Sequence, residues 1–363
     1  MKTVTLISFT LFSFCLFAVQ SLATIRTVNN NLNGPGIFTT IQAAHDAAAA
    51  GDTIYVASSP SNYGGATFTQ KIVLFGAGMR PGEKKDNSAY SGLSGEITLN
   101  AGSSGSIICG MLFNGNIIRI RATVINGQIL RNYFNTGGNH VFFEGATSGW
   151  IIANNYFQPN CSTVINMNSN IATNFIIQNN VFAESSGCGF QNGIAPIVNF
   201  SSTANCIISN NVFYGQQGAG VANNDQAFSN CANFLIENNI FHTMSPGGLS
   251  NSVMNNNITF GTAQDAIPYG SNSGLNNVSN IDPQLTTFSV NSFSPSQNYQ
   301  PAGGQAKTGG VGGIQMGVYG GTFNWVNSAV SPIPAIKNFS ITSGSTVPAG
   351  GSMTIKVTST KQN

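Results

Sequence analysis

Four ionisable side chains in two neighbouring segments are the residues best placed to do chemistry. In the segment from Ile118 to Arg121, strand alternation would turn the isoleucines inward and Arg119 and Arg121 outward. In the second segment, His140 and Glu144 face outward if the apolar residues at positions 141 and 143 belong to the core. On adjacent strands about 4.8 Å apart, this group could hold an acidic sugar. It could also abstract a proton, with Arg121 or His140 as the base.

Three further residues would extend this group into a binding surface. Phe142 lies between His140 and Glu144 in the chain, and Asn166 and Asn168 fall at comparable positions one repeat later. The simpler interpretation is an arginine–glutamate ion pair on the surface, which contributes only about 0–1 kcal/mol to stability. Both interpretations depend on strand register, because a slip by one residue exchanges the inward and outward sets.

A short repeat indicates which elements carry these residues. Two aliphatic residues, a polar residue, two asparagines, an apolar residue and Phe recur, with full copies starting at Ile151, Ile176, Ile207 and Leu235. With the weaker copies included, the second aliphatic residue returns every 18 to 31 positions between 108 and 254. Two or three short strands and their turns fill a coil of this length, whereas a propeller blade needs about 40 residues. Helical repeats would show a 3.6-residue period, which these segments lack. The repeat predicts an all-β fold, a single-stranded right-handed parallel β-helix solenoid.

Each residue type in the repeat has a structural reason in such a solenoid. The aliphatic residues and Phe would point inward and stack on their equivalents in the coils above and below. Asparagine tolerates the left-handed backbone that a sharp corner requires. Asparagine side chains stacked in register can also hydrogen-bond to the next coil, each bond contributing about 1 kcal/mol. We therefore interpret the asparagines as structural and not as a catalytic row.

The ends of the repeat region carry a family resemblance. A short amphipathic helix is expected over 39–50, with Gly51 as its stop and a first strand at Asp52–Val56. A helix in this place would cap the open end of the solenoid. The helix and strand, with the closing segments Asn280–Pro283 and Gly317–Gly321, resemble the cap and last coils of pectate-lyase-like β-helix proteins. The resemblance covers roughly 24–321 and implies the fold. It does not imply one function, because this fold hosts lyases, hydrolases, epimerases and adhesins alike.

The catalytic motifs usual in that family are not evident. Its lyases combine calcium-binding acidic residues with a basic residue, but the acidic residues here are scattered, and only Glu83 and Asp86 lie close in sequence. Its hydrolases use paired aspartates, and the chain contains no Asp-Asp. It also lacks a nucleophile elbow, a phosphate-binding loop and a His–Cys metal cluster. We expect no metal and no cofactor, and the sequence gives calcium no support.

The N-terminal sequence and the composition point to an exported protein. Residues 1–23 read as a signal peptide, with Lys2, an apolar run over 6–19, and small residues up to an expected cleavage between Ala23 and Thr24. A membrane anchor is the alternative, but the run is shorter than the roughly 20 residues that span a bilayer. Charged residues make up 7% of the chain, against about 25% in ordinary domains. No basic stripe exists that could neutralise phosphates, which excludes nucleic acid as a partner.

Other segments complete the predicted organisation. The β-helix is expected over 24–325, an exposed charged loop over 76–94, and a C-terminal β tail or partial module over 326–363, with strands near 335–341 and 352–358. Cys206 stands where other repeats carry Trp or Phe, which predicts a buried apolar filler. Cys161 and Cys188 fall at similar offsets in neighbouring repeats and could form a disulfide in an exported protein.

We therefore expect a secreted or cell-surface β-helix that binds an extracellular polysaccharide or acts as an adhesin or structural protein. The alternative is a polysaccharide lyase or glycoside hydrolase that uses the arginine, histidine and glutamate group. We expect a monomer without a membrane span.

Overall fold

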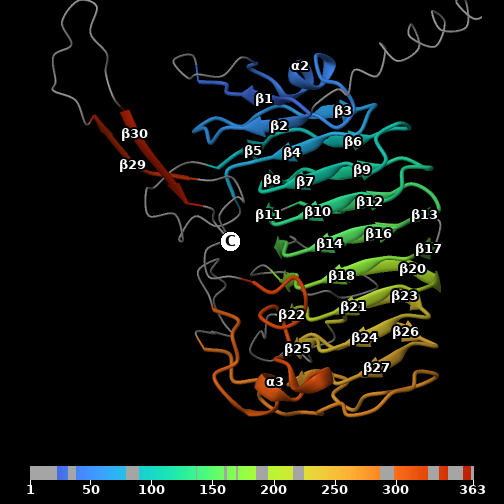
Figure 1. Ribbon diagram of the computed structural model, residues 1–363. Coiled ribbons are helices and arrows are strands. Elements are labelled where there is room, and N and C mark those ends of the chain that lie inside the picture. The colour runs from blue at the N-terminus through green and yellow to red at the C-terminus, as the bar shows by residue number, and fades with distance from the viewer. Residues whose placement is uncertain are drawn as a thin grey trace, which may run out of the picture.

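The computed structural model describes residues 23–31, 38–78, 90–135, 137–158, 162–168, 171–184, 195–215, 225–286 and 298–325, with two further strands at 335–341 and 355–360. The main body is a parallel β-helix, whose chain passes through three parallel sheets in successive coils (Figure 1). The predicted fold class is confirmed. The expected leader up to residue 22, residues 79–89 of the charged loop, Cys161 and Cys188 lie outside the described residues.

The three sheets run the length of the solenoid, and we name them A, B and C in the order in which the chain visits them. Sheet A contains β1 (Ile25–Val28), β2 (Thr53–Val56), β4 (Val73–Phe75), β7 (Ile107–Cys109), β10 (Gln128–Leu130), β14 (Ile151–Ala153), β18 (Ile176–Gln178), β21 (Ile207–Ser209), β24 (Leu235–Glu237) and β27 (Val253–Asn255). Sheet B contains β5 (Gly92–Leu93), β8 (Leu112–Asn114), β11 (Tyr133–Asn135), β15 (Tyr156–Gln158), β19 (Val181–Ala183), β22 (Val212–Tyr214), β25 (Ile240–His242) and β28 (Ile258–Phe260). Sheet C contains β3 (Ala66–Phe68), β6 (Ile97–Leu99), β9 (Ile118–Ile120), β12 (Val141–Phe143), β13 (Thr147–Ser148), β16 (Ile165–Met167), β17 (Ala172–Thr173), β20 (Ile197–Ala204), β23 (Phe228–Ala232) and β26 (Leu249–Ser250).

The phenylalanine of each repeat stacks on its equivalents inside sheet B. Neighbouring rings lie 4.6–5.1 Å apart between centroids and within 17° of parallel. Offset stacks of this kind add to the free energy gained by burying the rings. The six stacked residues are Phe113, Phe134, Phe157, Phe182, Phe213 and Phe241.

The second asparagine of each repeat forms a hydrogen-bonded ladder at the corner between sheets A and B. Its side-chain oxygen accepts the backbone N–H of the equivalent residue in the preceding coil, at 2.9–3.0 Å. Its side-chain nitrogen donates to the carbonyl of the repeat's second aliphatic position in that preceding coil, at 2.7–3.0 Å. The predicted structural role is confirmed. The ladder residues are Asn132, Asn155, Asn180, Asn211, Asn239, Asn257 and Asn277.

The first asparagine of each repeat supplies the left-handed corner. Asn154, Asn179, Asn210, Asn238 and Asn256 have φ between 52° and 58°. Asparagine adopts this region at lower cost than most side chains. The two adjacent asparagines of the repeat therefore do different work, one turning the chain and the other bonding between coils.

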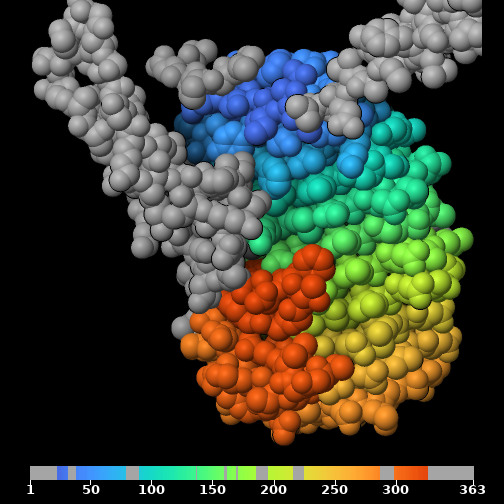
Figure 2. Space-filling view, viewed as in Figure 1, coloured from blue at the N-terminus to red at the C-terminus, as the bar shows by residue number. Residues whose placement is uncertain are grey.

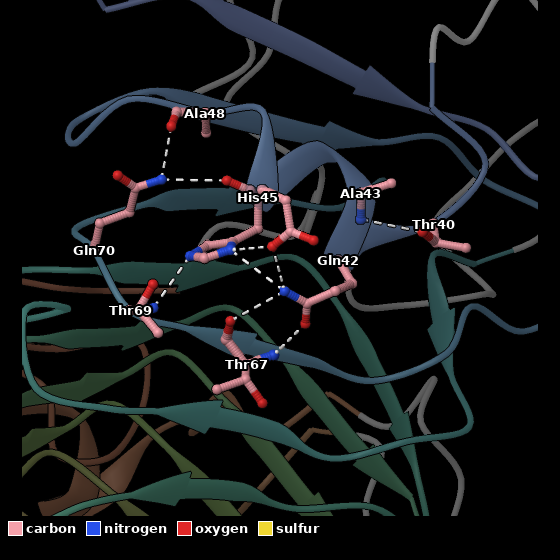
Figure 3. A network of polar contacts seen from close by, with 9 residues as sticks. Thr40, Gln42, Ala43, His45, Ala48, Thr67, Thr69 and Gln70 are labelled. Carbon is pink, nitrogen blue, oxygen red and sulfur yellow. Dashed lines mark hydrogen bonds and ion pairs between the residues drawn. The ribbon is translucent and has the colours of Figure 1, made fainter.

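The N-terminal end of the solenoid is capped by α2 (Ile41–Asp46), which is shorter than the predicted helix. The Thr40 side chain accepts the N–H of Ala43 at 3.2 Å and so caps the first turn. Gln42 accepts the N–H of Thr67 on β3 at 2.7 Å, and His45 Nε2 accepts the N–H of Thr69 at 3.1 Å (Figure 3). The His45 proton must then be on Nδ1, which lies 3.1 Å from the Asp46 carboxylate.

The closing segment 298–325 folds back along the outside of sheet B, a path that the sequence did not indicate. It contains α3 (Gly304–Thr308) and the 3-10 turn η1 (Val311–Gly313). In Figure 2 its orange and red atoms lie against the flank of the coils. Its buried apolar side chains Tyr299, Met316, Val318 and Trp325 form a second core with residues of sheet B, among them Tyr156, Val181, Val212, Ile240 and Ile258.

The corner asparagines also hold this closing segment. Asn179 donates to the carbonyls of Val318 and Gly320 at 2.9 and 2.6 Å. Asn256 donates to the Gly309 carbonyl at 2.8 Å, and the Asn238 side chain accepts the N–H of Val311 at 2.8 Å. These corner asparagines thus turn the chain and also hold the closing segment against sheet B.

Beyond the solenoid, β29 (Ala335–Ile341) and β30 (Ile355–Thr360) pair antiparallel. Cys206 is buried in the main core, as predicted for a filler residue. Among the described residues, no helix is long and apolar enough to cross a membrane.

Candidate functional site

The outer face of sheet C carries the candidate site. The register aligns Thr98 of β6, Arg119 of β9, Phe142 of β12 and Asn166 of β16 on successive strands. Their neighbours along each strand are buried, so these four side chains alternate outward. Arg119 and Phe142 therefore face outward on adjacent strands, as predicted.

The two arginines are joined to two glutamates in one charge network. Arg119 makes a bidentate pair with Glu96, Nε to Oε1 at 2.7 Å and Nη2 to Oε2 at 3.0 Å. Its Nη1 also reaches Glu144 at 3.2 Å. Arg121 Nη1 lies 2.6 Å from both oxygens of Glu144, and Thr98 donates to Glu96 at 2.7 Å. Two positive and two negative charges cancel within this group.

The network holds its carboxylates ionised. The hydrogen bonds from Arg121 are the main cause that lowers the pKa of Glu144; partial burial opposes them, and Arg119 reinforces them. Burial acts to raise the pKa of Glu96, but the bonds from Arg119 and Thr98 outweigh it and lower that pKa. The Glu96 carboxylate in turn raises the pKa of Arg119. An arginine in this setting is a poor base, because losing its proton would break these charge-assisted bonds.

His140 does not join this surface group, and its predicted outward position is wrong. Its side chain is fully buried and lies 5.3 Å from the Phe134 ring and 6.2 Å from the Phe157 ring between centroids. The reason is local: His140 precedes β12, and Asn139 before it has a φ of 49°. The left-handed turn ends the strand alternation on which the prediction depended.

Burial also changes the chemistry of His140. It lowers the pKa of the imidazole to about 3, an effect that the backbone of Asn116 only partly opposes. The Asn116 contact does not reach hydrogen-bond geometry, and among the described residues neither ring nitrogen of His140 has a partner. A neutral imidazole shielded from solvent by phenylalanines cannot act as a base for a substrate on the outer face.

Phe142 and Asn166 lie side by side on the outer face of sheet C. The Arg119 guanidinium lies over the Phe142 ring, 5.4 Å from its centroid. The Asn166 side chain donates to Asn139 at 3.3 Å and accepts from Asn199 at 3.4 Å. Asn168 is exposed at the end of β16, with its backbone N–H bonded to Phe143.

Two more asparagines extend the hydrogen-bonded chain of Asn139 and Asn166 into later coils. Asn199 on β20 accepts from Asn230 on β23 at 3.0 Å. The resulting row runs Asn139, Asn166, Asn199, Asn230, and we call it the amide row. Sequence reasoning missed Glu96, Asn139, Asn199 and Asn230, because the repeat motif marks sheets A and B and gives no register for sheet C.

The described part of the chain contains no group of three or more His, Cys, Asp or Glu residues that could hold a metal ion. No protein-family model matches the chain, and neither a curated protein nor a solved structure matches it.

Proposed function

We propose that this protein is an exported, pectate-lyase-like β-helix that binds an uncharged extracellular glycan along the outer face of sheet C. The observation that carries the proposal is the amide row, which meets the column of Arg119 and Phe142 at Asn166. From β6 to β23 this face crosses five strand steps of about 4.8 Å, roughly 24 Å in all. That length suits an extended polymer better than a single small molecule.

The chemistry of the face favours sugar hydroxyl groups. Asparagine and threonine side chains offer both donors and acceptors, as hydroxyl groups do. Phe142, beside Arg119, adds an apolar ring of intermediate exposure that a sugar ring can contact. Because the Arg119 and Arg121 charges are balanced by Glu96 and Glu144, the face has no surplus charge to select a uronate polymer.

A binding role is favoured over catalysis by the state of the ionisable groups. Lyase chemistry needs a base within reach of substrate, and hydrolysis needs two facing carboxylates, one of them protonated. Glu96 and Glu144 are held ionised by arginine, and His140 is sealed in the core.

The test is incubation of the secreted protein with neutral polymers (cellulose, xylan, mannan) and uronate polymers (polygalacturonate, alginate), with and without calcium. Retention on neutral polymer without new reducing ends or unsaturated products is the expected result. Depolymerisation that disappears in Arg121→Ala would replace the proposal with an enzyme. Absence of both retention and product would also reject it, leaving an adhesive role with a protein partner.

A further inference from the structure

A buried carboxylate gathers three donors where the N-terminal strand meets the cap. Asp52 is 1% exposed. Its Oδ1 accepts the backbone N–H of Thr24 at 2.8 Å. Its Oδ2 accepts the N–H of Ala49 at 2.9 Å and Arg26 Nε at 3.0 Å. Burial acts to raise the pKa of Asp52, but the bonds from Thr24, Ala49 and Arg26 outweigh it and lower that pKa.

Thr24 occupies a particular place in the chain. It follows Ala23, the last residue of the expected leader, and it directly precedes β1. Its carbonyl accepts the N–H of Thr53 at 2.9 Å, so its backbone is fixed on both sides against the start of β2. Ala23 and Thr24 are themselves exposed.

We propose that cleavage between Ala23 and Thr24 converts the Thr24–Asp52 hydrogen bond into an ion pair that locks the first strand of the mature protein. A signal peptidase would hydrolyse the bond with one water: the C–N bond breaks, Ala23 keeps the new carboxylate, and Thr24 leaves with an amine that takes up a proton. The nitrogen then lies as an ammonium at the position now bonded to Asp52 Oδ1. Charge-assisted bonds of this kind are roughly twice as strong as neutral ones.

The surrounding charges allow a defined pH dependence. Arg26 on β1 pairs with the Asp52 carboxylate. Lys71 lies two residues before Val73, the first residue of β4, and the Val73 N–H donates to the Asp52 carbonyl. The elements packed against β1 are β2 and α2; they carry Tyr55, and His45 and Asp46, of which the last two bond to each other. An amine paired with a carboxylate has a raised pKa, so its stabilisation is full below its unfolded pKa and is lost as pH rises through the folded value.

The experiment uses the full-length chain, expressed with its own leader in a secreting host. Intact mass and N-terminal sequencing of the secreted protein should identify Thr24 as the first residue. The rate of pulse acylation of its amine, read by mass spectrometry of the N-terminal peptide across pH, then gives the amine pKa. In the folded protein it should lie above the ordinary range of about 7.7–8.0, and in the denatured protein within it.

Variants separate the ion pair from its surroundings. Asp52→Asn should return the amine to the ordinary range, whereas Lys71→Gln, which removes a nearby charge outside the pair, should leave it raised. If Asp52→Asn does not fold, the folded and denatured wild-type values decide. A different first residue, or an amine that titrates alike in folded and denatured protein, would overturn the inference. It rests only on the proposed export, so loss of glycan binding would leave it standing.

Discussion

Two asparagines that are adjacent in the chain have different roles in this solenoid. Asn179 turns the backbone with a φ of 54° and binds the closing segment. Asn180, the next residue, is fully buried and bonds to Asn211, Asn155 and Ile152 in the neighbouring coils. Identical side chains are therefore not interchangeable, because the corner between the sheets assigns each a different task.

Asn180→Ala is expected to destabilise the protein by about 1–3 kcal/mol, since it leaves the buried Asn155 N–H without its partner and removes the bond to the Ile152 carbonyl. Denaturant unfolding monitored by circular dichroism measures the change. The exposed Asn114 serves as the control, and Asn114→Ala should stay within about 0.5 kcal/mol of wild type. Equal effects of the two substitutions would show that the ladder does not stabilise the fold.

His140 gives the protein an acid-sensitive position. Its folded pKa of about 3 lies below the ordinary 6.5, so the unfolded chain takes up the proton first as the pH falls. Stability should be complete above pH 6.5 and decline towards pH 3. His140→Phe, which extends the stack beside Phe134 and Phe157, should flatten this decline in melting temperature measured across pH. An unchanged slope would contradict the burial of His140. Burial likewise lowers the pKa of His242, to about 4, and that part of the decline should remain.

At the scale of elements, the closing segment is a cover over sheet B and not a further coil. Its Trp325 is 4% exposed and donates from Nε1 to the Asn179 carbonyl at 2.6 Å. The corner asparagines therefore couple this cover to the coils at several levels along the solenoid. Local loss of these contacts should free the cover while the stacked coils, each held by its neighbours, stay folded.

Trp325→Ala is expected to raise amide hydrogen exchange across 298–325, because it removes the buried anchor next to Asn179. Exchange in β14 and β18 should change little, since their ladders and stacks remain. Val311, which is 44% exposed, provides the control through Val311→Ala, which should have no effect on either region. Exchange that rises equally in cover and coils would mean that the two unfold as one unit.

The strands of sheets A and B could be predicted from the sequence, whereas the register of sheet C could not. The repeat located the strands of sheets A and B, because both flank the asparagine pair that recurs in the chain. Sheet C follows turns of variable length, so its register had to rest on alternation alone. Alternation placed Arg119 and Phe142 correctly inside β9 and β12, and failed for His140, which lies in the turn before β12. Glu96 could not be linked to Arg119 because no motif aligns β6 with β9.

At the scale of the whole molecule, the three outer faces differ in chemistry. Sheet A presents half-buried aliphatic side chains such as Ile151, Ile176 and Ile207. Sheet B packs the apolar side chains of β15, β19, β22, β25 and β28 against the closing segment. Sheet C carries the amide row and the balanced charge network. We therefore assign the proposed glycan binding to sheet C, whose amide row can match hydroxyl groups along a polymer.

Because the charges on sheet C cancel, retention on a neutral glycan should depend little on salt. Binding measured at 0.05 M and 1 M sodium chloride, concentrations that span Debye lengths of roughly 14 and 3 Å, should differ by less than about twofold. A steep loss of binding at high salt would indicate that the polymer is recognised through surplus charge, contrary to the balance of Arg119 and Arg121 against Glu96 and Glu144.

The most direct test of the account compares matched aromatic substitutions on two faces. Phe142 on sheet C and Phe75 on sheet A are both outward-facing and partly buried. The dissociation constant for the neutral polymer that retains wild-type protein should rise roughly 2- to 13-fold in Phe142→Ala, as expected for loss of one aromatic contact of about 0.5–1.5 kcal/mol. Phe75→Ala should bind as wild type does. Unchanged binding by Phe142→Ala, or weaker binding by Phe75→Ala alone, would contradict the assignment of sheet C as the binding face.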